Sequence, residues 1–161
     1  MSTLKVGTIQ DHANSNTAIS IDSGGKVTLP QLVHFHGNRD GSNVEEIAGL
    51  VPFNTVRDSH SAWNNTNKQF TVPVTGVYHI GFLNIGDSSV DTSSQWHSFQ
   101  FVRSGTTTTF ANVYNANDAQ YEHTGYSTCY HFQANDKIQL LNNSGAVYNG
   151  VYCTLSICLM G

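Results

Sequence analysis

The chain has 161 residues, of which 11% are charged, and its formal net charge is −4. Its length suits one domain with a sizeable core plus a short arm, and a charged fraction far below the usual quarter leaves its polar surface largely uncharged. The mild, dispersed charge contains no Lys/Arg stripe, which argues against nucleic acid as a partner.

The first residues and the cysteines bear on the compartment. Residues 1–20 lack a positively charged start followed by an apolar core, and no apolar run approaches membrane-spanning length. We therefore expect no membrane insertion and no secretion by the usual route. Cys129, Cys153 and Cys158 are odd in number and lack C-x-x-C spacing, which argues against a disulfide framework and against a cysteine zinc site.

Residues 1–31 are predicted to form a short β arm. In TAISIDSGGK, two isoleucines alternate with a serine before a Ser-Gly-Gly turn, which predicts a small strand and a β-hairpin. The apolar side chains of the arm are too few for a core, and an isolated hairpin is marginal in water. The arm therefore needs a partner surface. The side chains expected to dock there are Leu4, Val6, Ile9, Ile19 and Ile21.

Residues 32–161 are predicted to form an all-β head. Nine short strand candidates recur here at the spacing of a sandwich or jelly roll, with turn clusters such as NANDAQ and NNSG between them. The stretch NVEEIAGL, residues 43–50, shows the one hint of helix. The nine candidates are residues 32–38, 52–56, 69–74, 76–85, 97–103, 106–114, 125–132, 136–142 and 150–160.

The stretch QFTVPVTGVYHIGF, residues 69–82, predicts a corner. Its Val, Thr, Tyr, Phe and Ile residues favour strands, whereas Pro73 cannot donate a hydrogen bond to a sheet and belongs at an edge or a break. Two strands meeting at a bend satisfy both preferences. After Gly76 the faces of the second strand resolve into Tyr78, Ile80 and Phe82 on one side and Val77, His79 and Gly81 on the other.

This corner carries a resemblance to a known family. The stretch FNTVRDSHSAWNNTNKQFTVPVTGVYHIGF resembles the front half of the C1q-like domain, a trimeric jelly roll related to tumour necrosis factor. In that family an F-x-x-V strand precedes an aromatic residue and an F-T-x-P-x-x-G-x-Y corner. The residues that match are Phe53, Val56, Trp63, Phe70, Thr71, Pro73, Gly76 and Tyr78. The resemblance covers roughly Leu32 to Gly161 and implies a C1q/TNF-like jelly-roll β-sandwich that assembles as a homotrimer.

The arm carries a second resemblance. STLKVGTIQ followed by TAISIDSGGKVTLP resembles the opening of many small tail-fibre and virion proteins of tailed phages, particularly marine ones. Together the two resemblances imply a structural protein of the virion surface, assembled in the host cytoplasm, whose arm binds other virion proteins. Its role would be that of a tail fibre or receptor-binding tip that attaches to the host. The alternatives are a head fibre that decorates the capsid and a secreted C1q-like recognition module.

A trimer implies a buried contact between copies. Strand 150–160 is half apolar on both faces, as a strand packed in its own sandwich and against neighbouring subunits would be. The alternative is a core strand within one chain. The residues assigned to the trimer core are Tyr78, Ile80, Phe82, Leu155, Ile157 and Leu159.

Two loops are the candidates for receptor contact. GDSSVDTSSQW ends at Trp96, and YNANDAQYEH carries Tyr114, Asp118, Tyr121 and Glu122. Aromatic rings beside amides and carboxylates can stack on a host surface glycan and hydrogen-bond to it, and a host protein is the other possible partner. Many weak sites on one particle would raise the effective affinity. The alternative is that these aromatics pack against their own strands.

Two histidines are the remaining candidates for metal binding. In HFH, His34 and His36 share one face of a strand, so a trimer would bring six imidazoles to its threefold axis, enough ligands for a transition metal. A stacked or solvent-facing pair is the alternative, and no other cofactor is expected. The sequence contains no G-x-S-x-G, no H-E-x-x-H and no phosphate-binding glycine loop, so we expect no enzyme.

Overall fold

The computed structural model describes residues 6–10, 17–28, 32–39, 45–46, 49–87, 94–116 and 121–160. The chain divides into two compact units, Met1–Leu32 and Val33–Gly161. Within the described residues the regular structure is all strand. No helix in these ranges is long and apolar enough to cross a membrane.

The first unit is a three-stranded antiparallel sheet of β1 (Thr8–Gln10), β2 (Thr17–Ile21) and β3 (Val27–Thr28). The predicted hairpin between β2 and β3 is present, and β1 adds a third strand to it. In its turn, the Asp22 carboxylate accepts hydrogen bonds from the backbone N–H groups of Gly24 at 2.8 Å and Lys26 at 2.9 Å. An aspartate at this position favours a turn over a continuing strand.

One face of this small sheet is apolar. Ile9 pairs with Ile19, and Ile21 pairs with Val27, so these side chains share a face, while Thr8 and Ser20, which pair with each other, lie on the opposite face. Ile9 is 48% exposed and Val27 is 59% exposed. Leu4 lies outside the described residues. The unit thus leaves an apolar face uncovered within one protomer.

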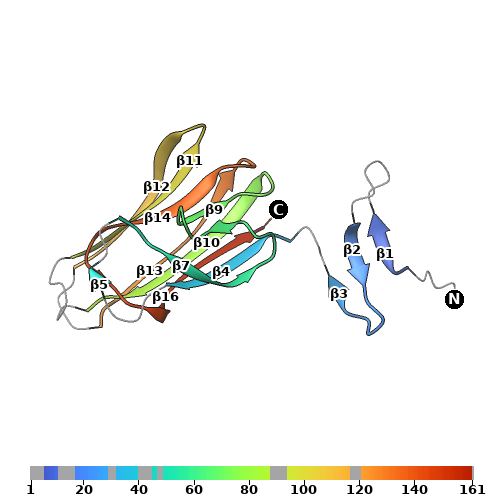
Figure 1. The fold of residues 1–161 in the computed structure, drawn as a ribbon, viewed down its shortest axis with the longest axis horizontal. Coiled ribbons are helices and arrows are strands. Elements are labelled where there is room, and N and C mark those ends of the chain that lie inside the picture. Colours follow the sequence, from blue (N-terminus) through green and yellow to red (C-terminus); the bar gives the residue numbers. More distant parts are fainter. Residues whose placement is uncertain are drawn as a thin grey trace. The chain divides into compact units, whose positions relative to one another are not determined.

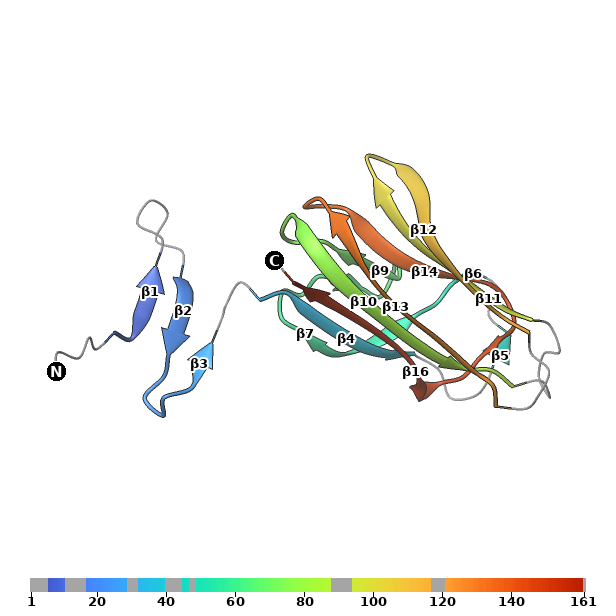
Figure 2. The same ribbon diagram turned by 180° about the vertical axis from the view of Figure 1, so that it is seen from behind.

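The second unit is a sandwich of two antiparallel sheets, shown from opposite sides in Figures 1 and 2. One sheet has the order β13-β10-β16-β4-β7, and the other has the order β12-β11-β14-β9-β8 with β6 also paired to β14. β15 (Ala146–Val147) pairs separately with β5 (Glu45–Glu46). The bounds of the first sheet are β4 His34–Arg39, β7 Phe53–Asp58, β10 Gly76–Ile85, β13 His123–Phe132 and β16 Gly150–Leu159. Those of the second are β6 Gly49–Leu50, β8 Trp63–Asn64, β9 Gln69–Thr71, β11 Gln95–Arg103, β12 Thr106–Asn115 and β14 Lys137–Ser144.

All nine strand candidates are confirmed, and so is the jelly-roll class. The alternation that predicted them also builds the core, because in β10 and β16 every second side chain points between the sheets. A bulge in β12 between the partners of Phe99 and Gln100 leaves Phe110 unpaired, and its ring packs 4.9 Å from the ring of Tyr130. Phe110 thereby joins the aromatic core.

The predicted corner at Pro73 is also confirmed. β9 ends at Thr71 in the six-stranded sheet, and β10 begins at Gly76 in the five-stranded sheet, so the chain changes sheets across the proline. The Tyr78 hydroxyl donates a hydrogen bond of 2.7 Å to the carbonyl of Val74 and closes the bend. Pro73 therefore lies where no ladder hydrogen bond is needed.

Two expectations need correction. In the stretch 43–50, the described residues are strand and not helix, because β6 pairs with β14 and the next residue, Val51, donates its N–H to the carbonyl of Leu140 at 2.9 Å. Five of the six side chains assigned to a trimer core are instead buried inside one protomer, each at most 5% exposed: Tyr78, Ile80, Phe82, Leu155 and Ile157. Leu159 is partly buried against the same core. The side chains already fill the sandwich, so only the opposite face of their sheet is available to a second copy.

Candidate receptor-binding face

An aromatic pair lies exposed on the outer side of the six-stranded sheet. Trp96 on β11 and Tyr114 on β12 are directly opposite each other in the antiparallel register. Trp96 is 46% exposed and Tyr114 is 67% exposed. Their neighbours along each strand, His97 and Val113, point into the sandwich, so the alternation of the strands turns both rings outward. We call these two residues the aromatic pair.

Hydrogen bonds hold the pair in position. The indole N–H of Trp96 donates to Oδ1 of Asn112 at 3.3 Å, and the Ser98 hydroxyl donates to the same oxygen at 2.7 Å. Asn143 on β14 donates its side-chain N–H to Ser98 at 2.7 Å. The Tyr114 hydroxyl donates to the Ser94 hydroxyl at 2.9 Å. These contacts fix the ring orientations and leave the ring faces to solvent.

A row of amides continues along the same face. Gln69 on β9 donates to Gln139 on β14 at 2.6 Å, and Gln139 donates to Gln100 on β11 at 2.9 Å. Gln100 donates in turn to Thr109 on β12 at 3.3 Å. The row crosses four strands without a formal charge. The row lies on the same side of the sheet as the aromatic pair, and that side offers ring faces for stacking and neutral hydrogen-bonding groups, with Gln139 only 7% exposed as the buried link of the row.

Buried polar side chains support this face from beneath. Asn84 on β10 and Thr124 on β13 both donate to Oε1 of Gln95, the first residue of β11, at 2.8 and 2.9 Å. All three side chains are at most 3% exposed. Gly86 leaves room for the Gln95 amide, because a Cβ there would lie 1.2 Å from its Nε2 atom. The network fixes the start of the strand that carries Trp96.

His97 lies in the same buried layer. Its ring is fully buried, 5.1 Å from the ring of Phe82, and its Nε2 atom is 3.5 Å from the amide nitrogen of Asn84. Burial lowers the pKa of His97 from 6.5 to about 4, because the charged imidazolium would lose its hydration. The imidazole is therefore neutral at pH 7.

The other predicted receptor contacts do not join the aromatic pair. Tyr121 is 52% exposed, and its ring packs 6.1 Å from the ring of Tyr148. Glu122 follows it, and its backbone carbonyl accepts the N–H of Gly86 at 2.7 Å. Asp118 lies outside the described residues. The sequence prediction thus joined two surfaces that the fold keeps distinct, and it missed the amide row.

The two predicted metal ligands lie on the outer side of the five-stranded sheet. Nδ1 of His36 forms a hydrogen bond of 2.8 Å with the hydroxyl of Ser156. Partial burial, then the positive charge of Arg57, and then His36 lower the pKa of His34. Among the described residues there is no group of three or more His, Cys, Asp or Glu side chains that would hold a metal ion. A metal shared between copies on a threefold axis stays a prediction.

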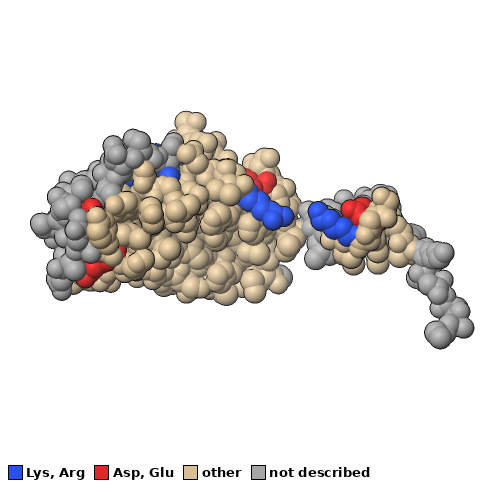
Figure 3. Space-filling view, turned by 90° about the horizontal axis from the view of Figure 1, so that it is seen from below, with Lys and Arg blue, Asp and Glu red and all other residues tan. Residues whose placement is uncertain are grey.

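The same outer side is poor in charge. Its apolar members include Val77 and Leu83, each 38% exposed, by the strand register. Met160, which is 65% exposed, follows β16 and donates its N–H to the carbonyl of Val77 at 2.8 Å. Among the described residues that point outward from these five strands, Arg57 carries the one formal charge besides the histidines. Figure 3 shows a broad side of this unit with Lys, Arg, Asp and Glu near its ends and few between them. We call this outer side the histidine face.

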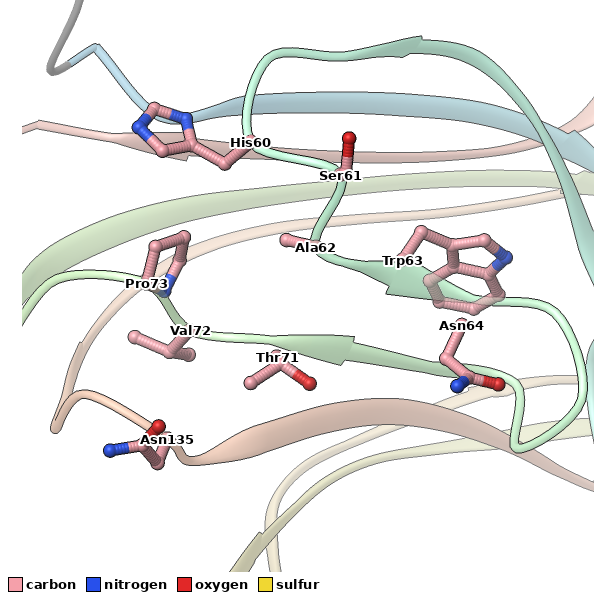
Figure 4. A pocket seen from close by; sticks show the side chains of 9 residues that line it. All are labelled: His60, Ser61, Ala62, Trp63, Asn64, Thr71, Val72, Pro73 and Asn135. Atoms are coloured by element: carbon pink, nitrogen blue, oxygen red, sulfur yellow. The ribbon is translucent and has the colours of Figure 1, made fainter.

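A hollow of about 310 Å³ lies beside β8 and β9. In Figure 4 the imidazole of His60 lies on the side of Pro73, whereas the indole of Trp63 lies on the side of Asn64. Nδ1 of His60 forms a hydrogen bond of 2.8 Å with the hydroxyl of its neighbour Ser59. The described residues that line the hollow include no Asp, Glu, Cys or Lys side chain.

Comparisons with known proteins agree on the fold. No protein-family model matches the sequence, and no curated protein matches it. Among solved structures, Eiger TNF from S. frugiperda is similar with a TM-score of 0.68 and 11% identity, over 81% of this chain and 93% of that one. Murine APRIL is similar with a TM-score of 0.63 and 11% identity, over 81% and 100%. The globular domain of zebrafish complement 1qA is similar with a TM-score of 0.61 and 12% identity, over 80% and 98%. The chain thus has the C1q/TNF-like jelly-roll fold.

Proposed function

We propose that the protein is a homotrimeric, non-enzymatic recognition module whose head binds a glycan and whose arm attaches it to a larger particle. The exposed aromatic pair is the observation that carries the recognition role. Trp96 and Tyr114 hold their rings outward, Asn112 accepts the indole N–H, and the amide row of described residues on the same side of the sheet carries no formal charge. Aromatic faces beside neutral donors and acceptors suit an uncharged sugar, whose apolar C–H faces stack on rings and whose hydroxyls bond to amides.

Replacing Trp96 with Ala is expected to lower the affinity for the best ligand on a glycan array at least about tenfold, or about 1.4 kcal/mol. The loss follows from removing a stacking surface that the fold has already oriented. The affinity should be measured with a soluble monovalent sugar, because repeated sites on one assembly mask the loss of a single contact. Thr107→Ala, an exposed change on β12, is the matched control and should bind normally. Full binding by the Trp96 variant would contradict the glycan role of the pair.

Self-association is the second part of the proposal. The folds of the similar structures and the charge-poor histidine face support it, since Val77 and Leu83 leave apolar surface exposed in one protomer. Contact through this face would bring His34 and His36 of several copies together, which is the arrangement that a shared transition metal requires. The resulting trimer would present three copies of the aromatic pair and bind by avidity.

The particle we propose is a tailed-bacteriophage virion, on which the protein acts as a fibre or receptor-binding tip that attaches to the host surface. The resemblance of STLKVGTIQ and TAISIDSGGKVTLP to phage virion proteins supports this assignment, and so does the uncovered apolar face of the arm. A capsid decoration is a second candidate. A secreted recognition module is a third, favoured by the likeness to the zebrafish complement 1qA domain.

Deleting residues 1–31 is expected to abolish incorporation into virions while the head stays folded. The arm is a separate compact unit, and the apolar side chains of Ile9, Ile21 and Val27 would be its contacts with a virion protein. Purified particles should be examined by immunoblotting for the protein and by labelled electron microscopy to separate tail from head. Normal incorporation of the deleted protein would show that the arm is not the anchor.

A further inference from the structure

A second aromatic site lies apart from the proposed glycan face. Ile85, Tyr121, Tyr148 and Tyr152 line a cleft of about 290 Å³. Ile85 ends β10, and Tyr152 lies near the start of β16, which pairs with the last residue of β4. The cleft therefore lies at the end of the sandwich where β4 ends. Tyr121 and Tyr152 are 52% and 50% exposed, so their rings are open to a ligand. We call this the tyrosine cleft.

The three rings stand at steep angles to one another. The ring centroids of Tyr121 and Tyr148 are 6.1 Å apart and their planes meet at 57°. Those of Tyr148 and Tyr152 are 5.3 Å apart and meet at 74°. Rings arranged in this way form walls around a compact space, whereas a flat sugar platform would present its rings in one plane.

The backbone holds each ring by a separate local feature. Tyr121 has a φ of 64°, a conformation that a bulky residue seldom adopts without a reason. The N–H of Tyr148 lies 3.3 Å from both the Ile85 carbonyl and Oδ1 of Asn84. Tyr152 lies in a bulge of β16. Gly150 pairs with Arg39 and Thr154 pairs with the adjacent Asn38, so the residues between them, Tyr152 included, have no partner in the register with β4. Bulges and strained residues of this kind re-aim side chains at functional sites.

Charged residues of both signs lie near the cleft. The buried Arg39 guanidinium donates to the carbonyl of Val147, next to Tyr148, at 3.1 Å. Asp87 follows Ile85 by two residues, and Glu122 follows Tyr121 directly. Burial, then Tyr121, and then Asp87 raise the pKa of Tyr148. One carboxylate oxygen of Glu122 is buried without a hydrogen-bond partner among the described residues. Aromatic ring faces and carboxylates both attract a cation.

We propose that the tyrosine cleft binds a quaternary ammonium group. The ring faces supply a negative quadrupole, and Ile85 supplies an apolar wall for the methyl groups. A quaternary ammonium ion has no N–H group to donate, so it needs no hydrogen-bond acceptor, which suits a lining of three ring faces and one isoleucine. The cleft is near the lower end of the usual size range for ligand sites, so it suits a compact head group better than an oligosaccharide. This site does not depend on the glycan proposal.

The test is a titration of the full-length protein with choline chloride, followed by the NMR signals of the tyrosine rings. The matched probe is 3,3-dimethyl-1-butanol, in which a neutral carbon replaces the ammonium nitrogen. Choline is expected to bind at least about tenfold more tightly, because only the cation interacts with the quadrupoles. Equal binding of the two probes would show a merely apolar slot. Absence of a saturable shift with choline would also overturn the proposal.

Variants of one exposed wall separate the ring from its hydroxyl. Tyr152→Leu is expected to weaken choline binding at least about fivefold, whereas Tyr152→Phe keeps the ring and should bind within about twofold of the parent. Equal losses in both variants would assign recognition to the hydroxyl and overturn the proposal. Thermal unfolding confirms that each variant is folded. Phosphocholine and Nε-trimethyl-lysine amide then distinguish a phosphorylated head group from a methylated protein side chain as the source of the cation.

Discussion

Leu83→Glu is expected to convert the proposed trimer, three times 17.6 kDa, into a monomer of 17.6 kDa. Leu83 is 38% exposed on the histidine face, between Gly125 of β13 and Thr154 of β16 in the register. In a trimer built on this face, the variant would bury three carboxylates in contacts that hold few opposite charges. An unpaired buried charge costs several kcal/mol, so the association constant should fall by more than about a hundredfold.

Light scattering of the purified protein across a range of concentrations measures this directly. Val102→Glu is the matched control, because it places the same charge on the outer side of the other sheet, opposite Lys137 in the register. The control should remain trimeric. If the Leu83 variant stayed trimeric, the contact between copies would have to lie on another surface. If the parent were monomeric at micromolar concentration, both the trimer and the avidity argument would be wrong.

Acid is expected to destabilise the head through His97, by about 3 kcal/mol between pH 6.5 and pH 4. In the folded protein the pKa of His97 is about 4, and in the unfolded chain it returns to about 6.5. The unfolded state therefore binds the proton first, so stability is fully present above pH 6.5 and is lost as the pH falls toward 4. The magnitude follows from about 1.36 kcal/mol for each unit of difference between the two pKa values.

Urea unfolding of the parent and of His97→Leu at pH 7.5 and pH 4.5 tests this expectation. The variant has no imidazole to protonate at this position, so its free energy of unfolding should change much less between the two pH values. The lowered pKa of His34 contributes a residual change of the same sign. Asp136 acts at lower pH, because hydrogen bonding to Arg103 lowers its pKa. An equal pH dependence in both proteins would show that the buried imidazole is not the source.

The strands were predictable from local sequence, and the stretch at residues 43–50 shows the limit of that approach. Val, Ile, Thr and aromatic residues at period two specify a strand wherever they occur, and Pro73 specifies a break in a ladder. Gly49 and Leu50 carry no such pattern. They are strand because β14, about ninety residues later, offers them hydrogen bonds. A short segment takes the structure that its partner imposes, which its own residues do not reveal.

The trimer-core assignment shows a second limit. Alternation along β10 correctly separated Tyr78, Ile80 and Phe82 from Val77 and His79, but it did not say which set faces the other sheet. The larger apolar set fills the sandwich, because burying more apolar area stabilises the fold more. Only the packed structure shows that Tyr78, Ile80 and Phe82 are buried in the core of one protomer and are not available to a second copy. The smaller set then becomes the surface that a second copy can contact.

By itself, the sequence determined the all-β class, the nine main strands, the corner and the two faces of each strand, because these depend on residues close together in the chain. The tertiary structure alone decided which distant side chains meet. Gln69 and Gln139 are 70 residues apart in the chain, yet their side chains form a hydrogen bond of 2.6 Å. The ring of Tyr121 likewise packs against that of Tyr148. Strand order and register set such neighbours, and both arise from global packing. The amide row, the buried layer around His97 and the tyrosine cleft are therefore properties of the fold.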